Sequence, residues 1–289
     1  MAQDTTGARG GGGGAGTAPG AGGDDGPRGA VGGAAGAERP AAGTGRPAAE
    51  ATPPAIKRRW DLLRRLAAAR RLWRAEFSFL VGLALFAVLA IYAKAYAYFA
   101  WDERVADAVQ AISLPGTEWL MRAGSFFGDG PNSWIVTGAA LLIFLTYGRR
   151  SEAAALLLST AGGSTLNRLI KYLIARPRPT LEHVRVTGEW AHESFPSGHV
   201  TFHVCFFGFL FFVAFALLPK GSLKRRVLCA LAALPVLTAG LSRVYLGAHW
   251  PSDTLGAYLL SGLWLGLSLH LYRRWKERST FHQKDAVSS

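Results

Sequence analysis

Residues 200–218 read VTFHVCFFGFLFFVAFALL, a run without Asp, Glu, Lys or Arg. A helix rises about 1.5 Å per residue, so a run of this length crosses the roughly 30 Å apolar layer of a bilayer. Inside that layer the backbone polar groups must bond within the segment itself, which a helix achieves. The run therefore predicts a transmembrane helix, and it indicates a membrane protein.

Five further apolar runs flank this one. The six expected spans occupy residues 77–100, 133–147, 153–174, 200–218, 227–246 and 253–271. The second is short for a span, and the loop 101–132 before it is expected to hold an amphipathic surface helix. The sequence thus predicts an all-α, polytopic membrane protein, a six-transmembrane-helix bundle whose core covers residues 77–272.

Basic residues give the chain a net charge of +13, and they fall in short clusters between the apolar runs. A nucleic-acid-binding protein gathers its bases on one surface instead, so nucleic acid is not an expected partner. The clusters at 57–74, 149–150, 220–226 and 273–278 would share one side of the membrane, which the positive-inside rule makes cytoplasmic. Both termini are then cytoplasmic, and the loops 101–132, 175–199 and 246–253 face the outer side.

The two ends of the chain differ from the bundle in composition. Residues 1–56 are rich in Gly, Ala and Pro and almost lack large apolar side chains, which predicts a disordered tail. Residues 57–76 alternate basic with Leu and Trp residues, the pattern of an interfacial helix. This helix either sets the orientation of the first span or binds anionic lipid. Residues 273–289 are the expected cytoplasmic C-terminal tail.

The first charged stretch on the outer side reads KYLIARPRP, from Lys171 to Pro179. Pro177 and Pro179 predict that the third helix stops near residue 175. Arg178 can then fold back beside Lys171. Two neighbouring cations in a partly dry site favour a multiply charged anion as ligand.

The second stretch, SFPSGH, ends at His199 and leads into the fourth span. A turn that opens a helix presents free N–H groups to an anion, and Gly198 permits close approach of the backbone. The Ser197 hydroxyl can add a donor. The alternative is a plain helix N-cap, which is common.

The third stretch, SRVYLGAHWPSD, runs from Ser242 to Asp253. Pro251 suits the first turn of the sixth helix, which places Asp253 where it can reach a ring nitrogen of His249. A carboxylate bonded to one nitrogen leaves the other free as a nucleophile or base. Arg243 supplies a third cation.

Together the three stretches resemble the signature of the type 2 phosphatidic acid phosphatase superfamily. That signature is Lys, six residues and Arg-Pro; then Pro-Ser-Gly-His; then Ser-Arg, five residues, His, three residues and Asp. The resemblance extends over about residues 77–272 and leaves out the tail and the basic helix.

The resemblance implies that His249 is a nucleophile that forms a phosphohistidine, that Asp253 holds its ring, and that His199 is the general acid for the leaving oxygen. It also implies a set of residues that bind the phosphate oxygens: Lys171, Arg178, Ser197, Gly198 and Arg243. Three cationic side chains would take the role of Mg²⁺ in other phosphoryl-transfer sites, so no metal and no cofactor is expected. His199 and His203, four residues apart, suggest a metal pair, but the Glu of a zincin motif is missing between them.

The function implied is a membrane lipid phosphate or diphosphate phosphohydrolase that acts at the outer leaflet. An isoprenoid diphosphate such as undecaprenyl diphosphate is the preferred substrate, because an outward site meets a spent polymer carrier. Phosphatidic acid and phosphatidylglycerol phosphate are alternatives. A lipid phosphotransferase and a noncatalytic lipid transporter or scaffold remain open as further alternatives. The resemblance and the composition favour a bacterial inner membrane, and the oligomeric state is left open.

Overall fold

The structure, a computed structural model, describes residues 54–287, and within that range every regular element is a helix. In chain order these are α1 (Pro54–Ala95), α2 (Ala100–Gln110), α3 (Thr117–Ser125), the short 3₁₀ helix η1 (Phe126–Gly128), α4 (Gly130–Thr146), α5 (Arg150–Ile174), α6 (Gly198–Leu217), α7 (Leu223–Tyr245) and α8 (Pro251–Val287). The chain divides into two units, Met1–Lys57 and Arg58–Ser289, and the site lies within the second. The predicted all-α class is confirmed.

The six predicted spans coincide with the longest described helices, α1 and α4 to α8. Within residues 54–287, four stretches are long and apolar enough to cross a membrane: Trp73–Ala95, Gly198–Leu217, Leu223–Tyr245 and Pro251–Arg278. Helix α4 is a shorter apolar helix. Helix α5 has 25 residues, but buried polar side chains such as Ser159, Thr160 and Asn167 lower its hydropathy. The polytopic membrane fold is confirmed.

Proline sets several helix ends, as the sequence predicts. Helix α5 ends at Ile174, where Ala175 takes a positive φ of 52° just before Pro177. Proline at the first helical position is favoured because no N–H is needed there, and α8 begins at Pro251. Both ends lie within the charged stretches, so that Arg178 and His249 fall outside the helices.

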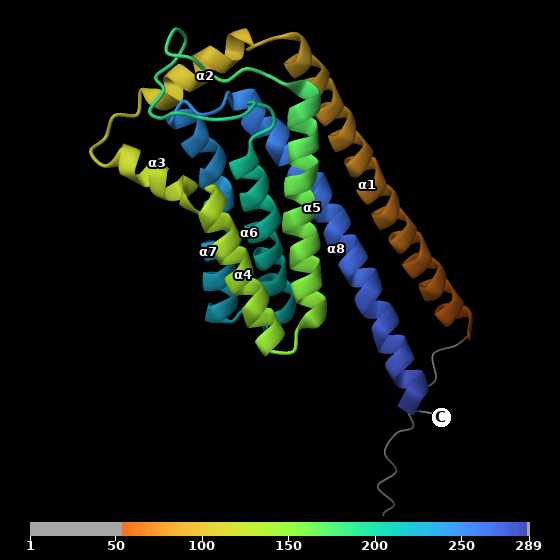
Figure 1. Cartoon of the computed structure of the whole chain (residues 1–289). Coiled ribbons are helices and arrows are strands. Elements are labelled where there is room, and N and C mark those ends of the chain that lie inside the picture. The colour runs from red at the N-terminus through yellow and green to blue at the C-terminus, as the bar shows by residue number, and fades with distance from the viewer. Residues whose placement is uncertain (1–53, 288–289) are drawn as a thin grey trace, which may run out of the picture. The chain divides into compact units, whose positions relative to one another are not determined.

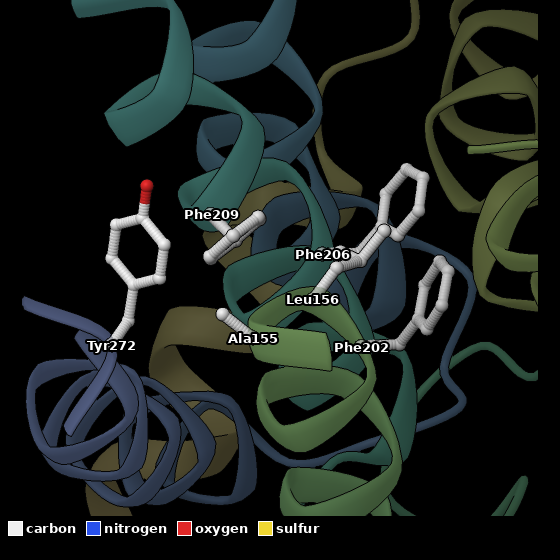
Figure 2. Close-up of a cluster of buried hydrophobic side chains, with 6 residues drawn as sticks. All are labelled: Ala155, Leu156, Phe202, Phe206, Phe209 and Tyr272. Atoms are coloured by element: carbon white, nitrogen blue, oxygen red, sulfur yellow. The ribbon is translucent and has the colours of Figure 1, made fainter. Parts of the chain in front are cut away.

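An apolar core lies between α5, α6 and α8 (Figure 2). Leu156 of α5 and Phe209 of α6 have no exposed surface. The rings of Phe202 and Phe206 stack with their centroids 5.3 Å apart, and Phe209 meets Tyr272 of α8 edge to face. Because aromatic side chains fill this space, the three helices are fixed against one another below the site.

The polar loops gather at the opposite end of these helices, where α2 and α3 lie (Figure 1). Helix α2 packs on α7 and α8, and α3 packs on α7. The sequence predicted one amphipathic helix in the loop 101–132. The structure instead has two helices and η1 there, because the loop turns at Gly116, whose φ is +84°. This end of the bundle therefore has a helical cover.

Helices α1 and α8 both extend beyond the spans that the sequence predicts. The predicted disordered tail, residues 1–56, lies outside the described residues except for its last three, where α1 has begun. Helix α1 is continuous, so the basic segment 57–76 and the first span form one helix. Helix α8 likewise continues to Val287, through most of the expected C-terminal tail. The division of the chain at residues 76 and 272 stays a prediction.

Candidate active site

A cavity of about 870 Å³ opens among the charged stretches at the covered end of the bundle. Its lining includes six of the eight predicted site residues: Lys171, Arg178, Gly198, His199, Arg243 and His249. The other two, Ser197 and Asp253, have no exposed surface and adjoin residues of the lining. Arg168 of α5 also lines the cavity. Stretches that are far apart in the chain thus meet at one site.

His249 lies in the short turn between α7 and α8, outside the membrane-spanning segments, and is 2% exposed. The turn depends on Gly247, whose φ is +68° and where a Cβ atom would lie 2.1 Å from the carbonyl oxygen of Arg185. Burial, followed by the charges of Arg178 and Lys171, lowers the pKa of His249 well below its usual 6.5. The imidazole is therefore neutral at pH 7, as a nucleophile must be.

Asp253 lies close to His249, as the sequence predicted, and its role in holding the ring stays a prediction. The distance between His249 Nδ1 and Asp253 Oδ2 is 3.6 Å, too long for a hydrogen bond. The same oxygen accepts bonds from Ser194 Oγ at 2.5 Å and from Trp250 N at 2.9 Å. The carboxylate thus has other donors, and His249 Nδ1 has no hydrogen-bond partner among the described residues.

Two of the cations are anchored by backbone carbonyl groups. Lys171 Nζ donates to the carbonyl oxygens of Glu193 and Ser194, at 2.5 and 3.2 Å. Arg178 donates to three carbonyl groups of the surrounding loops, and its Nη1 lies 3.4 Å from His249 Nε2. The ring nitrogen that faces the cavity therefore has a cation beside it, where a phosphoryl oxygen would need one.

Arg243 is the most buried of these cations, at 2% exposed. Its guanidinium lies over the Trp190 ring, 4.3 Å from the centroid, and its Nη1 donates weakly to Ser125 Oγ at 3.3 Å. Its Nε has no hydrogen-bond partner among the described residues. A buried guanidinium with an unused donor beside a cavity can bind an anion.

The turn before α6 is also built for an anion. Ser197 is the N-cap residue of α6, but its hydroxyl makes no capping bond, and it has no partner among the described residues. The plain N-cap interpretation therefore does not account for this side chain. A buried free hydroxyl next to the first N–H groups of a helix, together with Gly198 in the cavity wall, is a donor set for oxygen ligands.

His199 has a partner that the sequence did not identify. Its Nε2 lies 2.9 Å from Asp129 Oδ1, and its ring covers Gly128, where a Cβ atom would lie 2.5 Å from the ring. The hydrogen bond with His199 lowers the pKa of the Asp129 carboxyl below its usual 3.8. Asp129 lies in the sequence GDGP at the end of the loop 101–132. The sign that could have found it is an acid at the predicted edge of a span.

His203 lies one turn after His199 and is fully buried. Its Nδ1 is 2.7 Å from the carbonyl oxygen of His199, so the two rings do not form a ligand pair through that nitrogen. Among residues 54–287, no group of three or more His, Cys, Asp or Glu side chains is placed to hold a metal ion.

Comparison with known proteins places this site in a family. Residues 152–277 match the family model of the PAP2 superfamily. A lipid A 1-phosphatase of Rhizobium johnstonii is 34% identical over 163 residues, which are 48% of this chain and 62% of that protein. One of Rhizobium etli is 32% identical over 170 residues, 51% of this chain and 68% of that protein. The chain belongs to the PAP2 superfamily.

Other members of the PAP2 superfamily are similar over longer stretches. Phosphatidylglycerophosphatase B of Bacillus subtilis is 26% identical over 181 residues, 61% of this chain and 85% of that protein. The crystal structure of a transmembrane PAP2-type phosphatidylglycerolphosphate phosphatase from Bacillus subtilis aligns with a TM-score of 0.57 at 24% identity. The alignment covers 68% of this chain and 96% of that one. This likeness shows the shared fold.

The PAP2 match includes all eight predicted site residues, because it begins at Glu152. It leaves out α1 to α4, which contribute Asp129 to the site. The resemblance found in the sequence is therefore confirmed at the level of the family, and the matched relatives are named as phosphatases. The roles of the single residues stay predictions.

Proposed function

We propose that this protein is a membrane lipid phosphatase in which His249 is the nucleophile. The observation that carries the proposal is a buried imidazole that faces a cavity with three cations: Lys171, Arg178 and Arg243. Positive charge around a neutral nucleophile favours an electrophile with several negative oxygens, as in a phosphate monoester or diphosphate. A merely structural cluster has no physical need for this arrangement.

In the proposed first step, His249 Nε2 attacks phosphorus in line with the bond to the leaving oxygen. A bond between nitrogen and phosphorus forms, the bond from phosphorus to the leaving oxygen breaks, and His199 gives that oxygen a proton. In the second step, water attacks the phosphohistidine, His199 takes a proton from it, and inorganic phosphate leaves. The three cations and the Ser197–Gly198 turn bind the phosphoryl oxygens throughout, without a metal ion.

The substrate is proposed to be a lipid because the site adjoins membrane-spanning helices, so that the apolar chains stay in the bilayer while the phosphate enters the cavity. A lipid A-type phosphate is the first candidate, since the two relatives above 30% identity are lipid A 1-phosphatases. An isoprenoid diphosphate, which the sequence favours, is the second. This second candidate is supported by the expected position of the site on the outer side of the membrane.

The test is phosphate release by the detergent-purified full chain, in excess EDTA, from four lipids: lipid A 1-phosphate, undecaprenyl diphosphate, phosphatidylglycerol phosphate and phosphatidic acid. We expect release that survives EDTA and falls about 10⁴-fold in His249→Ala, the scale seen when a nucleophile is removed. His270→Ala, an exposed histidine in the middle of α8 that does not line the cavity, is the matched control. Release that persists in His249→Ala would overturn the mechanism, and no release from any lipid by folded protein would favour a phosphotransferase or a noncatalytic role.

We also propose that the site opens on the outer side of a bacterial inner membrane and that both termini are cytoplasmic. The support is the distribution of basic clusters, which lie at the helix ends away from the site. Reporter fusions after Arg150 and after Trp190 are expected to report opposite sides of the membrane. The same side for both would contradict this topology.

A further inference from the structure

Behind His249 and Asp253 lies a closed polar cluster in which one arginine is shared by two carboxylates. Arg176 Nη1 donates to Asp253 Oδ1 at 2.6 Å, and its Nη2 donates to Asp102 Oδ2 at 2.9 Å. The side chains of all three residues have no exposed surface. The cluster is therefore sealed from solvent, and among the described residues Arg176 is the cation that forms an ion pair with both carboxylates.

Arg176 has every nitrogen of its guanidinium engaged. Besides the two carboxylates, it donates through Nε to the carbonyl oxygen of Ala97 at 3.0 Å and through Nη1 to Ser252 Oγ at 2.6 Å. The ring of Phe99 covers it, 4.6 Å from the guanidinium carbon. A planar group held by so many acceptors and a ring has one orientation, and lysine could not reproduce it.

Asp102 connects the cluster to the surface helix α2. Its Oδ1 accepts a bond from the backbone N–H of Ser252 at 2.8 Å, and its Oδ2 accepts one from the Ser252 hydroxyl at 2.7 Å. Ser252 is in the first turn of α8, so Asp102 binds the positive end of the helix that carries Asp253. Helix α2 is thus joined to the catalytic end of α8 by buried bonds.

The charges of the cluster determine what Asp253 can do. With two carboxylates and one guanidinium, the cluster carries one net negative charge. Arg176 binds Asp253 Oδ1, while Oδ2, which accepts bonds from Ser194 and Trp250, lies 3.6 Å from His249 Nδ1. Without Arg176, two buried carboxylates would repel each other, and one would take up a proton. A protonated Asp253 could not stabilise the positive imidazole ring that forms when His249 is phosphorylated.

We propose that Arg176 and Asp102 are positioning residues that keep Asp253 ionised and oriented toward His249. This inference rests on the proposed function. Neither residue is among those that the three sequence stretches assign to the site, and Asp102 lies outside the part that matches the PAP2 family model.

The test compares kcat and KM of the purified full chain in four variants: Arg176→Gln, Arg176→Lys, Asp102→Asn and the double variant Arg176→Gln/Asp102→Asn. In Arg176→Gln we expect kcat to fall about 100-fold with KM nearly unchanged, because the partner of a catalytic group is lost and no phosphate ligand is. The double variant removes one charge of each sign and restores the net charge of the cluster. Its kcat is expected to exceed that of Arg176→Gln at least about tenfold.

A merely structural role predicts a lower kcat in the double variant than in Arg176→Gln, because a second buried substitution adds to the damage of the first. Arg176→Lys should lie between the wild type and Arg176→Gln, since it keeps the charge and loses the fork of donors. Arg274→Gln and Asp107→Asn, both exposed, are the matched controls. A kcat of Arg176→Gln within about twofold of wild type, or a double variant no better than the single one, would overturn the inference.

A second readout does not depend on turnover. Carbethoxylation of His249 by diethyl pyrocarbonate, followed by mass spectrometry, is expected to slow in Arg176→Gln and to recover in the double variant. If wild-type protein releases no phosphate but this labelling pattern holds, the proposed function has failed and the positioning role stands. If the wild type is active and the labelling does not depend on Arg176, the positioning role has failed alone.

Discussion

The first turn of α6 and its middle share one helix but have opposite surroundings. At the first turn, His199 meets Asp129 and the cavity with its cations. In the middle, Phe206 and Phe209 are buried among apolar side chains of α5 and α8. The polar end is ordered by specific partners, and the apolar middle is ordered by packing. Activity and stability should therefore depend on different residues of the same helix.

The largest expected effect is a loss of activity when a residue of the polar region around the cavity is replaced. In Arg178→Ala, kcat/KM is expected to fall about 100- to 1000-fold, the range seen when one donor to a developing negative charge is removed. The melting temperature should change little in comparison. Phosphate release and thermal unfolding of the same preparation measure both, and Arg226→Ala, an exposed arginine, is the control. A loss no greater than in the control would remove Arg178 from the site.

The next largest effect is a loss of stability when a residue of the apolar middle of α6 is replaced. Phe209→Ala is expected to lower the free energy of unfolding by about 1 to 3 kcal/mol, less than in a soluble core, because the helices already lie in an apolar solvent. The kcat of the protein that remains folded should stay within about twofold of wild type. Thermal unfolding of Phe209→Ala and of the exposed Phe215→Ala checks this. Equal melting temperatures for these two variants would contradict the assigned core.

A smaller effect tests the residue that connects the surface loop to α6. Asp129→Asn is expected to lower kcat about tenfold, because His199 loses the charged partner that stabilises its protonated form. The alkaline limb of the pH profile for kcat should then shift to lower pH. The measurement is the pH dependence of phosphate release, with Asp107→Asn as control. An unchanged limb would show that Asp129 does not act through His199.

The smallest effect concerns the protonation of His249. Its pKa is held well below the usual 6.5 in the folded protein, so the unfolded chain binds a proton first as the pH falls below 6.5. Stability is therefore present above that pH and is lost as pH falls, by at most about 1.4 kcal/mol per pH unit. Thermal unfolding at pH 7.5, 6.5 and 5.5 should show a weaker acid dependence in His249→Gln than in the wild type. The same dependence in both would mean that the histidine is protonated in the folded protein.

The fold was predictable because its main signals are local. Proline stops α5 before Pro177 and starts α8 at Pro251, and apolar runs mark the long helices. The meeting of the three charged stretches followed from their position at the same ends of the predicted helices. The sequence predicted that Asp253 can reach a ring nitrogen of His249. The two atoms lie 3.6 Å apart, longer than a hydrogen bond, because Ser194 and the Trp250 N–H bind the same oxygen; the role of Asp253 stays a prediction.

The amino-acid sequence by itself determined the family, the all-α membrane fold and six of the residues that line the cavity, because hydropathy, proline positions and motif spacing are properties of short segments. Only the tertiary structure decided that Asp129 reaches His199 and that Arg176 is shared by Asp102 and Asp253. These partners lie 70 or more positions apart in the chain. A hydrogen bond needs two atoms within about 3 Å, and no local pattern specifies which distant groups the packed helices will bring that close.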